Sequence, residues 1–480
     1  MPNYALVTFG CQMNQHDSER IGEVLRGAGY REVGEPAQAD LVLLNTCSVR
    51  EKAEQKLRSE VGRLGVLKRE RPDLLIGVAG CVAQQEGERL LKRLPQIDLI
   101  VGPDNIAELP GLLAELEIGA PPRVRTEFDT DAPRFLRAAP EAGRARPSAF
   151  VTVMKGCNER CSFCIVPYTR GPERYRPSSE VVDEIGRLVE AGVREVTLLG
   201  QTVNSYIDPE GALSPAPGAG QSPWRHTRGA RSLEDESEFA ALLRSIAERV
   251  PGLARLRYTS PHPRHLTMSL IQAHQELGVL ARHVHLPVQS GSDRVLRRMI
   301  RRYSVAEYVE RVEALRQAVP GVTLSTDVIV GFPGETREDF EATLALVDRL
   351  KYAGLFGFKY SERPFTPALK LGDDVSEDEK SARLEELFSL GDGHRKAHLS
   401  SLVGSVQDVL VEGQGKTGSL TGRSERNEIV HFPGDRALVG RIVQVRIREA
   451  FKNSLAGEPL QAVRVEPKGR QFPRSLPVVG

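Results

Sequence analysis

Three cysteines on one short loop constrain this chain more than any other feature of its sequence. They lie in the stretch Cys157-Asn-Glu-Arg-Cys161-Ser-Phe-Cys164, directly after an apolar run that predicts a strand. Thiolates this close in sequence can bind one metal centre. A closed structural zinc site needs four ligands, and no fourth Cys or His lies nearby in the sequence. Three thiolates can instead hold a cubane iron–sulfur cluster with one iron left open. A zinc site and an inert loop are the alternatives.

The other three cysteines are far apart in sequence but share one context. Cys11, Cys47 and Cys81 each follow an apolar run, and Gly10 and Gly80 precede two of them. The carboxyl ends of parallel strands share one edge of a sheet, where ligands bind, so these thiols can converge. Glycine permits the close backbone approach that a bulky group needs. We therefore predict a second, auxiliary cluster on this triad, with three inert buried cysteines as the alternative.

The order of apolar runs predicts an α/β chain with three domains. Residues 1–120 alternate short strands with amphipathic helices, which indicates a parallel-sheet, Rossmann-like domain. Residues 148–375 contain six further strand–helix units, as in an open (βα)6 barrel, with a Gly-, Pro-, Ser- and Arg-rich insertion at 208–236. Residues 118–147 predict a linker. Residues 400–466, where apolar positions alternate in twos, predict a small antiparallel β-barrel.

The predicted elements can be stated by residue. The strands are Tyr4–Gly10, Leu41–Thr46, Leu74–Gly80, Ile97–Val101, Phe150–Lys155, Glu195–Leu199, Leu256–Thr259, His283–Val288, Leu324–Val330, Leu355–Tyr360, Val406–Glu412 and Arg441–Arg448. In the first domain, the helical stretches are Asp17–Gly29, Val49–Glu70 and Gln84–Leu94.

Composition and charge limit the partners and the cellular location that we expect for the protein. The net charge is 65 − 64 = +1, so any basic surface must be local. No apolar run approaches the ~20 residues of a membrane helix, and the N-terminus shows no export signal. We expect no membrane association, a cytoplasmic location, and reduced cysteines rather than disulfides.

Polar residues at the predicted strand ends are candidates for a pocket. Gln201 and Asn204 follow one strand of the predicted barrel, and Gln289 and Asp327 lie at the ends of two others. Ligand sites in such barrels form at the carboxyl ends of the strands. We predict that these four residues contact a cofactor or substrate. The alternative is that they cap strands and turns.

The chain resembles a known enzyme family at its motifs. The Cys157–Cys164 spacing, with Phe163 before the last cysteine, is similar to that of the radical S-adenosylmethionine superfamily. The auxiliary triad and the three-domain order resemble the methylthiotransferase family over nearly the whole chain. Three stretches fit its dimethylallyladenosine branch: Thr8-Phe-Gly-Cys-Gln-Met-Asn14, Cys164-Ile-Val-Pro-Tyr-Thr-Arg-Gly171 and His285-Leu-Pro-Val-Gln-Ser-Gly-Ser292. Tyr175, Thr202 and Phe365 depart from the residues that are usual in this family.

This resemblance implies a specific reaction. It implies two [4Fe-4S] clusters, S-adenosyl-L-methionine, and methylthiolation of C2 of N6-dimethylallyladenosine at tRNA position 37. A reductant such as flavodoxin or ferredoxin is implied as a partner, and a monomer is expected. The same chemistry on threonylcarbamoyladenosine of tRNA or on a ribosomal-protein aspartate is the alternative. A non-catalytic, metal-stabilised RNA-binding protein is a third hypothesis.

The predicted C-terminal barrel resembles the TRAM domain, which implies contact with RNA. Small β-barrels are platforms for single-stranded nucleic acid. Arg423, Arg426 and Arg441 are the candidate RNA-binding residues, with a solvated charged face as the alternative. A second basic run predicts a helix with several guanidiniums on one side, facing either phosphate or solvent. This run comprises Arg294, Arg297, Arg298, Arg301 and Arg302.

Overall fold

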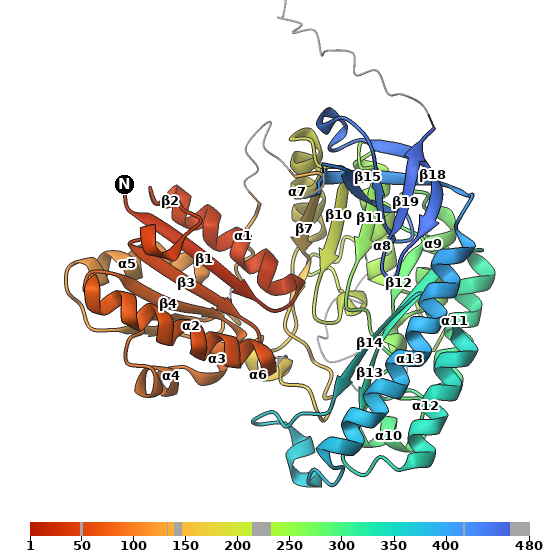
Figure 1. The fold of residues 1–480 in the computed structure, drawn as a ribbon, viewed down its shortest axis with the longest axis horizontal. Helices are drawn as coiled ribbons and strands as arrows, with labels where there is room; N and C mark the ends of the chain where they lie inside the picture. Colours follow the sequence, from red (N-terminus) through yellow and green to blue (C-terminus); the bar gives the residue numbers. More distant parts are fainter. Residues whose placement is uncertain (49–50, 132, 139–145, 214–231, 416–417, 461–480) are drawn as a thin grey trace, which may run out of the picture. The chain divides into compact units, whose positions relative to one another are not determined.

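The computed structural model describes residues 1–48, 51–131, 133–138, 146–213, 232–415 and 418–460. Its contacts divide the chain into two compact units, Met1–Arg395 and Lys396–Gly480, both drawn in Figure 1. The centre of the predicted insertion, with Trp224, lies outside the described residues, as do parts of the predicted linker and the last residues of the predicted 400–466 barrel.

The first unit begins with a six-stranded, all-parallel sheet, which we call the sheet part. Its strand order is β2-β1-β3-β4-β5-β6. The elements are β1 (Asn3–Phe9), α1 (Gln12–Gly27), β2 (Arg31–Glu32), β3 (Leu41–Thr46), α2 (Glu51–Glu70), β4 (Leu75–Gly80), α3 (Cys81–Glu86), α4 (Glu88–Arg93), β5 (Leu99–Val101), α5 (Leu109–Glu117) and β6 (Arg123–Arg125).

Helices cover both faces of this sheet (Figure 1). Along β3, Leu41 and Leu43 pack in the core that contains α1 and α5, whereas Val42 and Leu44 pack in the core that contains α2. Successive side chains of a strand point to opposite faces, so a strand buried on both sides is apolar throughout. This explains the continuous apolar runs of the sequence and confirms the predicted parallel-sheet domain.

Two details of this part differ from the sequence-based expectation. β6 lies inside the stretch predicted as a linker, and it extends the sheet past residue 120 by pairing with β5. The helical stretch predicted at 84–94 is two helices, because Gly87 between them has φ +49°. The first of these helices begins at Cys81 itself.

The barrel part follows in the same unit. Its elements are β7 (Ser148–Thr152), β8 (Met154–Lys155), α6 (Val166–Thr169), β9 (Arg174–Tyr175), α7 (Ser178–Glu190), β10 (Glu195–Leu199), α8 (Glu238–Arg249), β11 (Arg255–Tyr258), α9 (Met268–Glu276), β12 (His283–His285), α10 (Asp293–Arg298), α11 (Val305–Ala318), β13 (Thr323–Val330), α12 (Arg337–Leu350) and β14 (Gly354–Lys359). Helix α13 (Glu377–Ser401) leads into the second unit.

All six strands predicted for the barrel are present, and all are parallel. They form two sheets of three, β11-β10-β7 and β12-β13-β14. An isolated parallel bridge joins Leu256 of β11 to Leu280, which lies shortly before β12. Among the described residues no ladder joins β7 to β14, so the arrangement is open, as predicted. One hydrophobic core spans both halves.

The second unit is a closed barrel of five strands. These are β15 (Val406–Gln414), β16 (Leu420–Ser424), β17 (Ile429–Phe432), β18 (Ile442–Ala450) and β19 (Leu455–Pro459). Val443, Val445 and Ile447 of β18 point into its core, and the residues between them are exposed. The predicted barrel is therefore present. Its strand pairings are antiparallel except for that between β17 and β19, which is parallel. In this one pairing the structure differs from the predicted antiparallel barrel.

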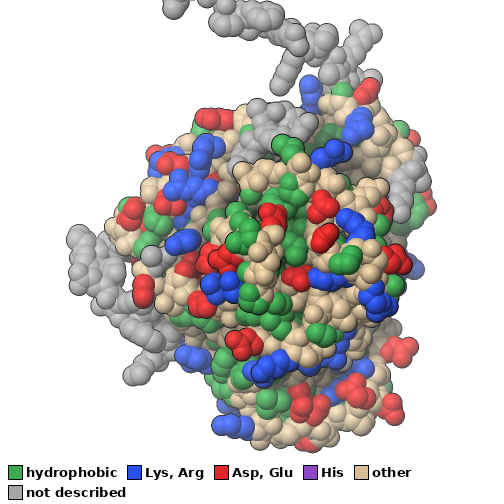
Figure 2. All heavy atoms as spheres, turned by 90° about the vertical axis from the view of Figure 1, so that its left-hand side faces the viewer, with side chains coloured by type: hydrophobic (Ala, Val, Ile, Leu, Met, Phe, Trp, Pro, Cys, Tyr) green, Lys and Arg blue, Asp and Glu red, His purple; other side chains and the backbone are tan. Residues whose placement is uncertain are grey.

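The surface is consistent with the near-zero net charge. In the view of Figure 2, basic and acidic side chains are interspersed around apolar ones and do not form a field of one sign. Within the described ranges, no helix combines the length and apolar character needed to cross a membrane.

Candidate metal centres and cofactor pocket

The auxiliary triad lies where three neighbouring strands of the sheet part end. β1, β3 and β4 are adjacent and parallel, and their carboxyl ends are in register. Cys47 and Cys81 directly follow β3 and β4, and Cys11 comes just past β1. The contact with the Cys47 thiol is the main cause that lowers the pKa of Cys11 to about 6. The structure therefore brings these remote cysteines together.

The glycines before two of these cysteines are required by the close packing. Gly10 has φ +135°, and a Cβ there would lie 2.5 Å from Cβ of Cys47. Gly80 has φ +91°, and a Cβ there would lie 2.3 Å from Oδ1 of Asn45. A side chain at either position would be strained by both its backbone conformation and a clash.

Buried amides tie these strand ends together, and sequence reasoning missed them. Nδ2 of Asn14 donates to Oδ1 of Asn45 (3.1 Å). Nδ2 of Asn45 donates to the carbonyl of Asn14 (2.8 Å) and to Oγ of Ser18 (2.9 Å). Cys11 Sγ lies 3.3 Å from Oδ1 of Asn14. The signal in the sequence is Asn45, a polar residue that follows four apolar residues in the predicted strand Leu41–Thr46 and is fully buried in the structure.

The second triad occupies the loop that follows β8. The β8–β9 hairpin closes the base of this loop, and the N–H of Cys157 donates to the carbonyl of Gly171 (3.1 Å). Cys157 Sγ lies 3.0 Å from Oγ1 of Thr202, one of the positions that depart from the family. Cys157 and Cys161 are buried, and Cys164 is partly exposed.

The chemistry of this triad fits an iron–sulfur cluster. Burial raises the pKa of Cys157 well above its usual value and that of Cys164 to about 12, and nearby negative charges add to both effects. Thiolates crowded in this way need bound cations to be stable. Among the described residues, neither triad has its three sulfurs within the 4.8 Å that would suit one ion. A cubane suits a wider spacing because each thiolate binds a different iron.

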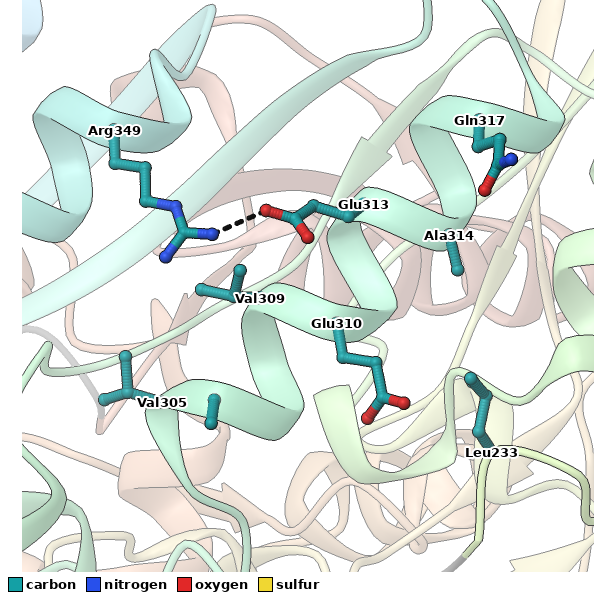
Figure 3. A pocket seen from close by; sticks show the side chains of 9 residues that line it. Leu233, Val305, Val309, Glu310, Glu313, Ala314, Gln317 and Arg349 are labelled. Atoms are coloured by element: carbon teal, nitrogen blue, oxygen red, sulfur yellow. Dashed lines mark hydrogen bonds and ion pairs between the residues drawn. The ribbon is translucent and has the colours of Figure 1, made fainter.

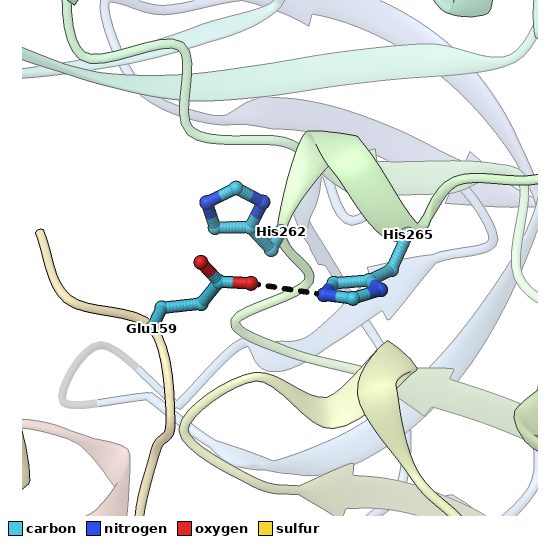
Figure 4. Close-up of side chains that lie close together, drawn as sticks. All are labelled: Glu159, His262 and His265. Atoms are coloured by element: carbon cyan, nitrogen blue, oxygen red, sulfur yellow. Dashed lines mark hydrogen bonds and ion pairs between the residues drawn. The ribbon is translucent and has the colours of Figure 1, made fainter. Parts of the chain in front are cut away.

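Glu159, His262 and His265 do meet the single-ion spacing, and all three are buried (Figure 4). Yet Nε2 of His265 lies 3.1 Å from Oε1 of Glu159, and Nη2 of Arg264 lies 3.4 Å from the same oxygen. A second guanidinium, Arg302, lies 3.9 Å from Glu159. These cationic partners already neutralise the carboxylate. The group therefore anchors the cysteine loop to the segment after β11 and is a poor site for a cation.

The four predicted pocket residues have different environments. Both polar side-chain atoms of Gln201 are buried without a hydrogen-bond partner among the described residues. Asn204 instead uses its amide on the backbone of His262, so its side chain is already occupied. Gln289, with φ +70°, donates its N–H to the carbonyl of Asp327 (2.9 Å). These two residues are therefore neighbours, while Gln201 belongs to the other sheet.

The basic run at 294–302 is not one exposed helical face. Helix α10 ends at Arg298, and Ile300 and Arg302 have φ +56°. Arg294 pairs with Asp339 on α12. Arg301 is buried, and its Nη1 donates to Sγ of Cys161 (3.2 Å). The prediction of one helical face through Arg302 is therefore wrong, because the helix ends at Arg298 and Arg301 is buried. Contact of the exposed Arg294 and Arg297 with phosphate stays a prediction.

The candidate RNA-binding arginines of the second unit are not equivalent. Arg423 is half-buried and pairs with Glu412 (3.3 Å) and with Oδ1 of Asn427 (3.3 Å). Arg426 is also partly buried, and its N–H donates to Ser424 (3.2 Å). Arg441 is exposed and directly precedes β18.

An open hollow lies on the outer face of α11 (Figure 3). Arg349 and Glu313 form an ion pair across it at 2.6 Å. Its remaining lining is Leu233, Val305, Ala306, Val309, Glu310, Ala314 and Gln317. None of the predicted site residues lines this hollow, so we do not assign the chemistry to it.

Comparison with known families agrees with these features. An uncharacterized protein family, UPF0004, matches residues 3–102, the radical SAM superfamily matches 151–347 and the TRAM domain matches 400–460. Among solved structures, the radical S-adenosylmethionine methyltransferase TsrM from Kitasatospora setae, with cobalamin and a [4Fe-4S] cluster bound, has a TM-score of 0.51 and 17% identity. The alignment covers 77% of this chain and 74% of that one. This likeness shows the fold alone.

Full-length relatives share one name, tRNA-2-methylthio-N(6)-dimethylallyladenosine synthase. The protein from Sorangium cellulosum is 62% identical, covering 100% of this chain and 99% of its own. The one from Geobacter sulfurreducens is 46% identical, covering 94% and 96%. The chain therefore belongs to the methylthiotransferase family of radical S-adenosylmethionine enzymes, among the tRNA-2-methylthio-N(6)-dimethylallyladenosine synthases.

Proposed function

We propose that this protein replaces the C2 hydrogen of N6-dimethylallyladenosine at tRNA position 37 with a methylthio group. The observation that carries the proposal is that two separate cysteine triads lie in one compact unit. One triad on a barrel loop fits radical chemistry, and the other, at the sheet edge, fits a second cluster that provides sulfur. Full-length relatives that carry this activity in their name support the choice of substrate.

Each side chain has a defined task in this proposal. Cys157, Cys161 and Cys164 would hold the radical cluster, and the auxiliary triad the second one. When bound, the clusters supply the electron that cleaves S-adenosyl-L-methionine and the sulfur that is transferred. Both amide atoms of Gln201 are buried and have no partner within the described part of the chain, so this side chain can hydrogen-bond that cofactor. Gln289 and Asp327 contribute a second polar wall from the other sheet.

The atoms balance with two molecules of S-adenosyl-L-methionine. The C2–H bond of the adenine breaks, and its hydrogen passes to the 5′-deoxyadenosyl group of one molecule. The C5′–S bond of that molecule would break, with methionine as its leaving group. The C2–S bond would form to a sulfur given up at the auxiliary triad, and the methyl group would come from the second molecule, which leaves as S-adenosylhomocysteine. A one-electron protein donor such as flavodoxin or ferredoxin supplies the electrons.

The second unit would bind the tRNA. A five-stranded closed barrel with the exposed Arg441 fits contact with the phosphate backbone. We place the enzyme in the cytoplasm, where its substrate is found, and expect it to act as a monomer.

A substrate comparison tests this function. The anaerobically reconstituted protein would receive cofactor and reductant, together with tRNA carrying dimethylallyladenosine, tRNA carrying threonylcarbamoyladenosine, or the ribosomal-protein substrate. Mass spectrometry of digested products should show methylthiolation of the first only. Methylthiolation of another substrate instead would overturn the assignment. Failure to form 5′-deoxyadenosine with any of them would favour a non-catalytic RNA-binding protein.

A further inference from the structure

One arginine of the barrel part reaches the auxiliary triad of the sheet part. Arg170 follows Cys164 closely in sequence, at the end of α6, and is only 7% exposed. Its Nε donates to Sγ of Cys81 at 3.2 Å. Its Nη2 pairs with Oδ2 of Asp17 on α1 at 2.6 Å. The segment that begins at a ligand of one triad therefore ends on a ligand of the other.

The radical triad has a matching arginine. Arg301 is 6% exposed, and its Nη1 donates to Sγ of Cys161 at 3.2 Å. Each triad thus has one sulfur that accepts a hydrogen bond from a buried guanidinium. The two arginines differ in their second partner, because Arg301 donates to the hydroxyl of Tyr303 (3.2 Å) and Arg170 pairs with a carboxylate.

The charges around Arg170 are fixed at neutral pH. Burial alone would raise the pKa of Asp17, but the Arg170 charge and hydrogen bonds outweigh it and lower this pKa to about 2. The guanidinium of Arg170 keeps its positive charge at neutral pH, as arginine does in proteins. Cys81 therefore faces a permanent cation, which a permanent anion partly offsets.

A cation at this distance favours the reduced form of a cluster. A cubane bound by three thiolates is already anionic, and reduction adds another negative charge. A nearby positive charge and an N–H···S hydrogen bond stabilise the reduced form more than the oxidised form, which raises the reduction potential. Loss of Asp17 should act in the opposite direction from loss of Arg170.

We propose that Arg170 is a positioning residue that joins the radical loop to the auxiliary triad and raises the reduction potential of the cluster held there. The inference rests on the proposed function only in requiring a cluster on Cys11, Cys47 and Cys81. Because Arg170 belongs to the barrel part and Cys81 to the sheet part, the reduction potential of the auxiliary cluster would depend on the contact between these two parts.

The test measures potentials and does not depend on turnover. Full-length protein with Cys157, Cys161 and Cys164 replaced by Ala keeps only the auxiliary triad, and the complementary variant keeps only the radical triad. Midpoint potentials come from redox titrations followed by electron paramagnetic resonance. Arg170→Gln should lower the reduced-to-oxidised ratio of the auxiliary cluster about tenfold at a fixed potential, which is about 59 mV for one electron. Asp17→Asn should raise this ratio.

The matched controls separate charge from folding. Arg170→Lys keeps the charge and should largely restore the potential, whereas a merely structural role would not give opposite shifts for Arg170→Gln and Asp17→Asn. Arg301→Gln should shift the radical cluster and leave the auxiliary cluster unchanged. If the midpoint potential of the auxiliary cluster is unchanged in iron-loaded Arg170→Gln, this inference is overturned while the proposed function stands. Absence of iron on the auxiliary triad, even with Arg170 intact, would overturn the proposed function as well.

Discussion

Asn204 binds His262 through both backbone groups of that residue. Its Nδ2 donates to the carbonyl of His262 (3.0 Å), and its Oδ1 accepts from the N–H of His262 (2.8 Å). Asn204 is 1% exposed, so no water replaces these bonds if the amide is removed. The pair fixes the end of β10 to the segment after β11, next to the radical loop.

Replacing Asn204 should therefore cost stability. Asn204→Ala leaves two buried backbone groups without partners, at about 1–3 kcal/mol for each unsatisfied group. We expect the free energy of unfolding in urea to fall by about 2 kcal/mol or more. A loss below about 0.5 kcal/mol would show that this link contributes little.

Gln201 should behave in the opposite way. Its amide atoms have no partner within the described residues, so Gln201→Ala removes no protein hydrogen bond and should leave unfolding unchanged or slightly improved. Binding of S-adenosyl-L-methionine to the cluster-loaded protein should weaken about tenfold, as expected for one lost hydrogen bond of about 1.4 kcal/mol. Equilibrium dialysis measures this, and unchanged affinity would remove Gln201 from the pocket.

Asp339 should make part of the stability depend on acid pH. Burial raises the pKa of Asp339, but hydrogen bonds from Arg294, Ser292 and Thr336 outweigh it and lower the pKa below its usual value. The ionised carboxylate therefore stabilises the fold above the unfolded pKa of about 3.9, and this contribution is lost as the pH falls through the folded pKa. The stability gap between the wild type and Asp339→Asn should be largest near pH 7 and narrow below about pH 4. Urea titrations across this range check it, and a constant gap would contradict it.

Arg441 should contribute to tRNA affinity through phosphate contact. Arg441→Ala should weaken binding and reduce the slope of log affinity against log salt by about 0.7–0.9, the value for one phosphate contact. Arg423→Ala should have a smaller effect, since Glu412 already pairs with Arg423. Arg349→Ala, in the hollow on α11, is the matched control and should leave the slope unchanged.

The sequence predicted the parts of the site that depend on strand order. Cys11, Cys47 and Cys81 could be placed together because each follows a strand and parallel strands share an edge. The contacts of Arg170 and Arg301 could not be predicted, because both depend on tertiary packing between distant segments. Helical spacing in the sequence predicts a helix through Arg302, but α10 ends at Arg298 and the chain turns through positive φ at Ile300 and Arg302.

The central claim is that the two triads perform different tasks, and one variant tests it most directly. Protein with Cys11, Cys47 and Cys81 replaced by Ala should hold about four irons, compared with about eight in the wild type. With cofactor, reductant and dimethylallyladenosine-containing tRNA, it should still form 5′-deoxyadenosine but give no methylthiolated nucleoside by mass spectrometry. Methylthiolated nucleoside from this variant would contradict the account.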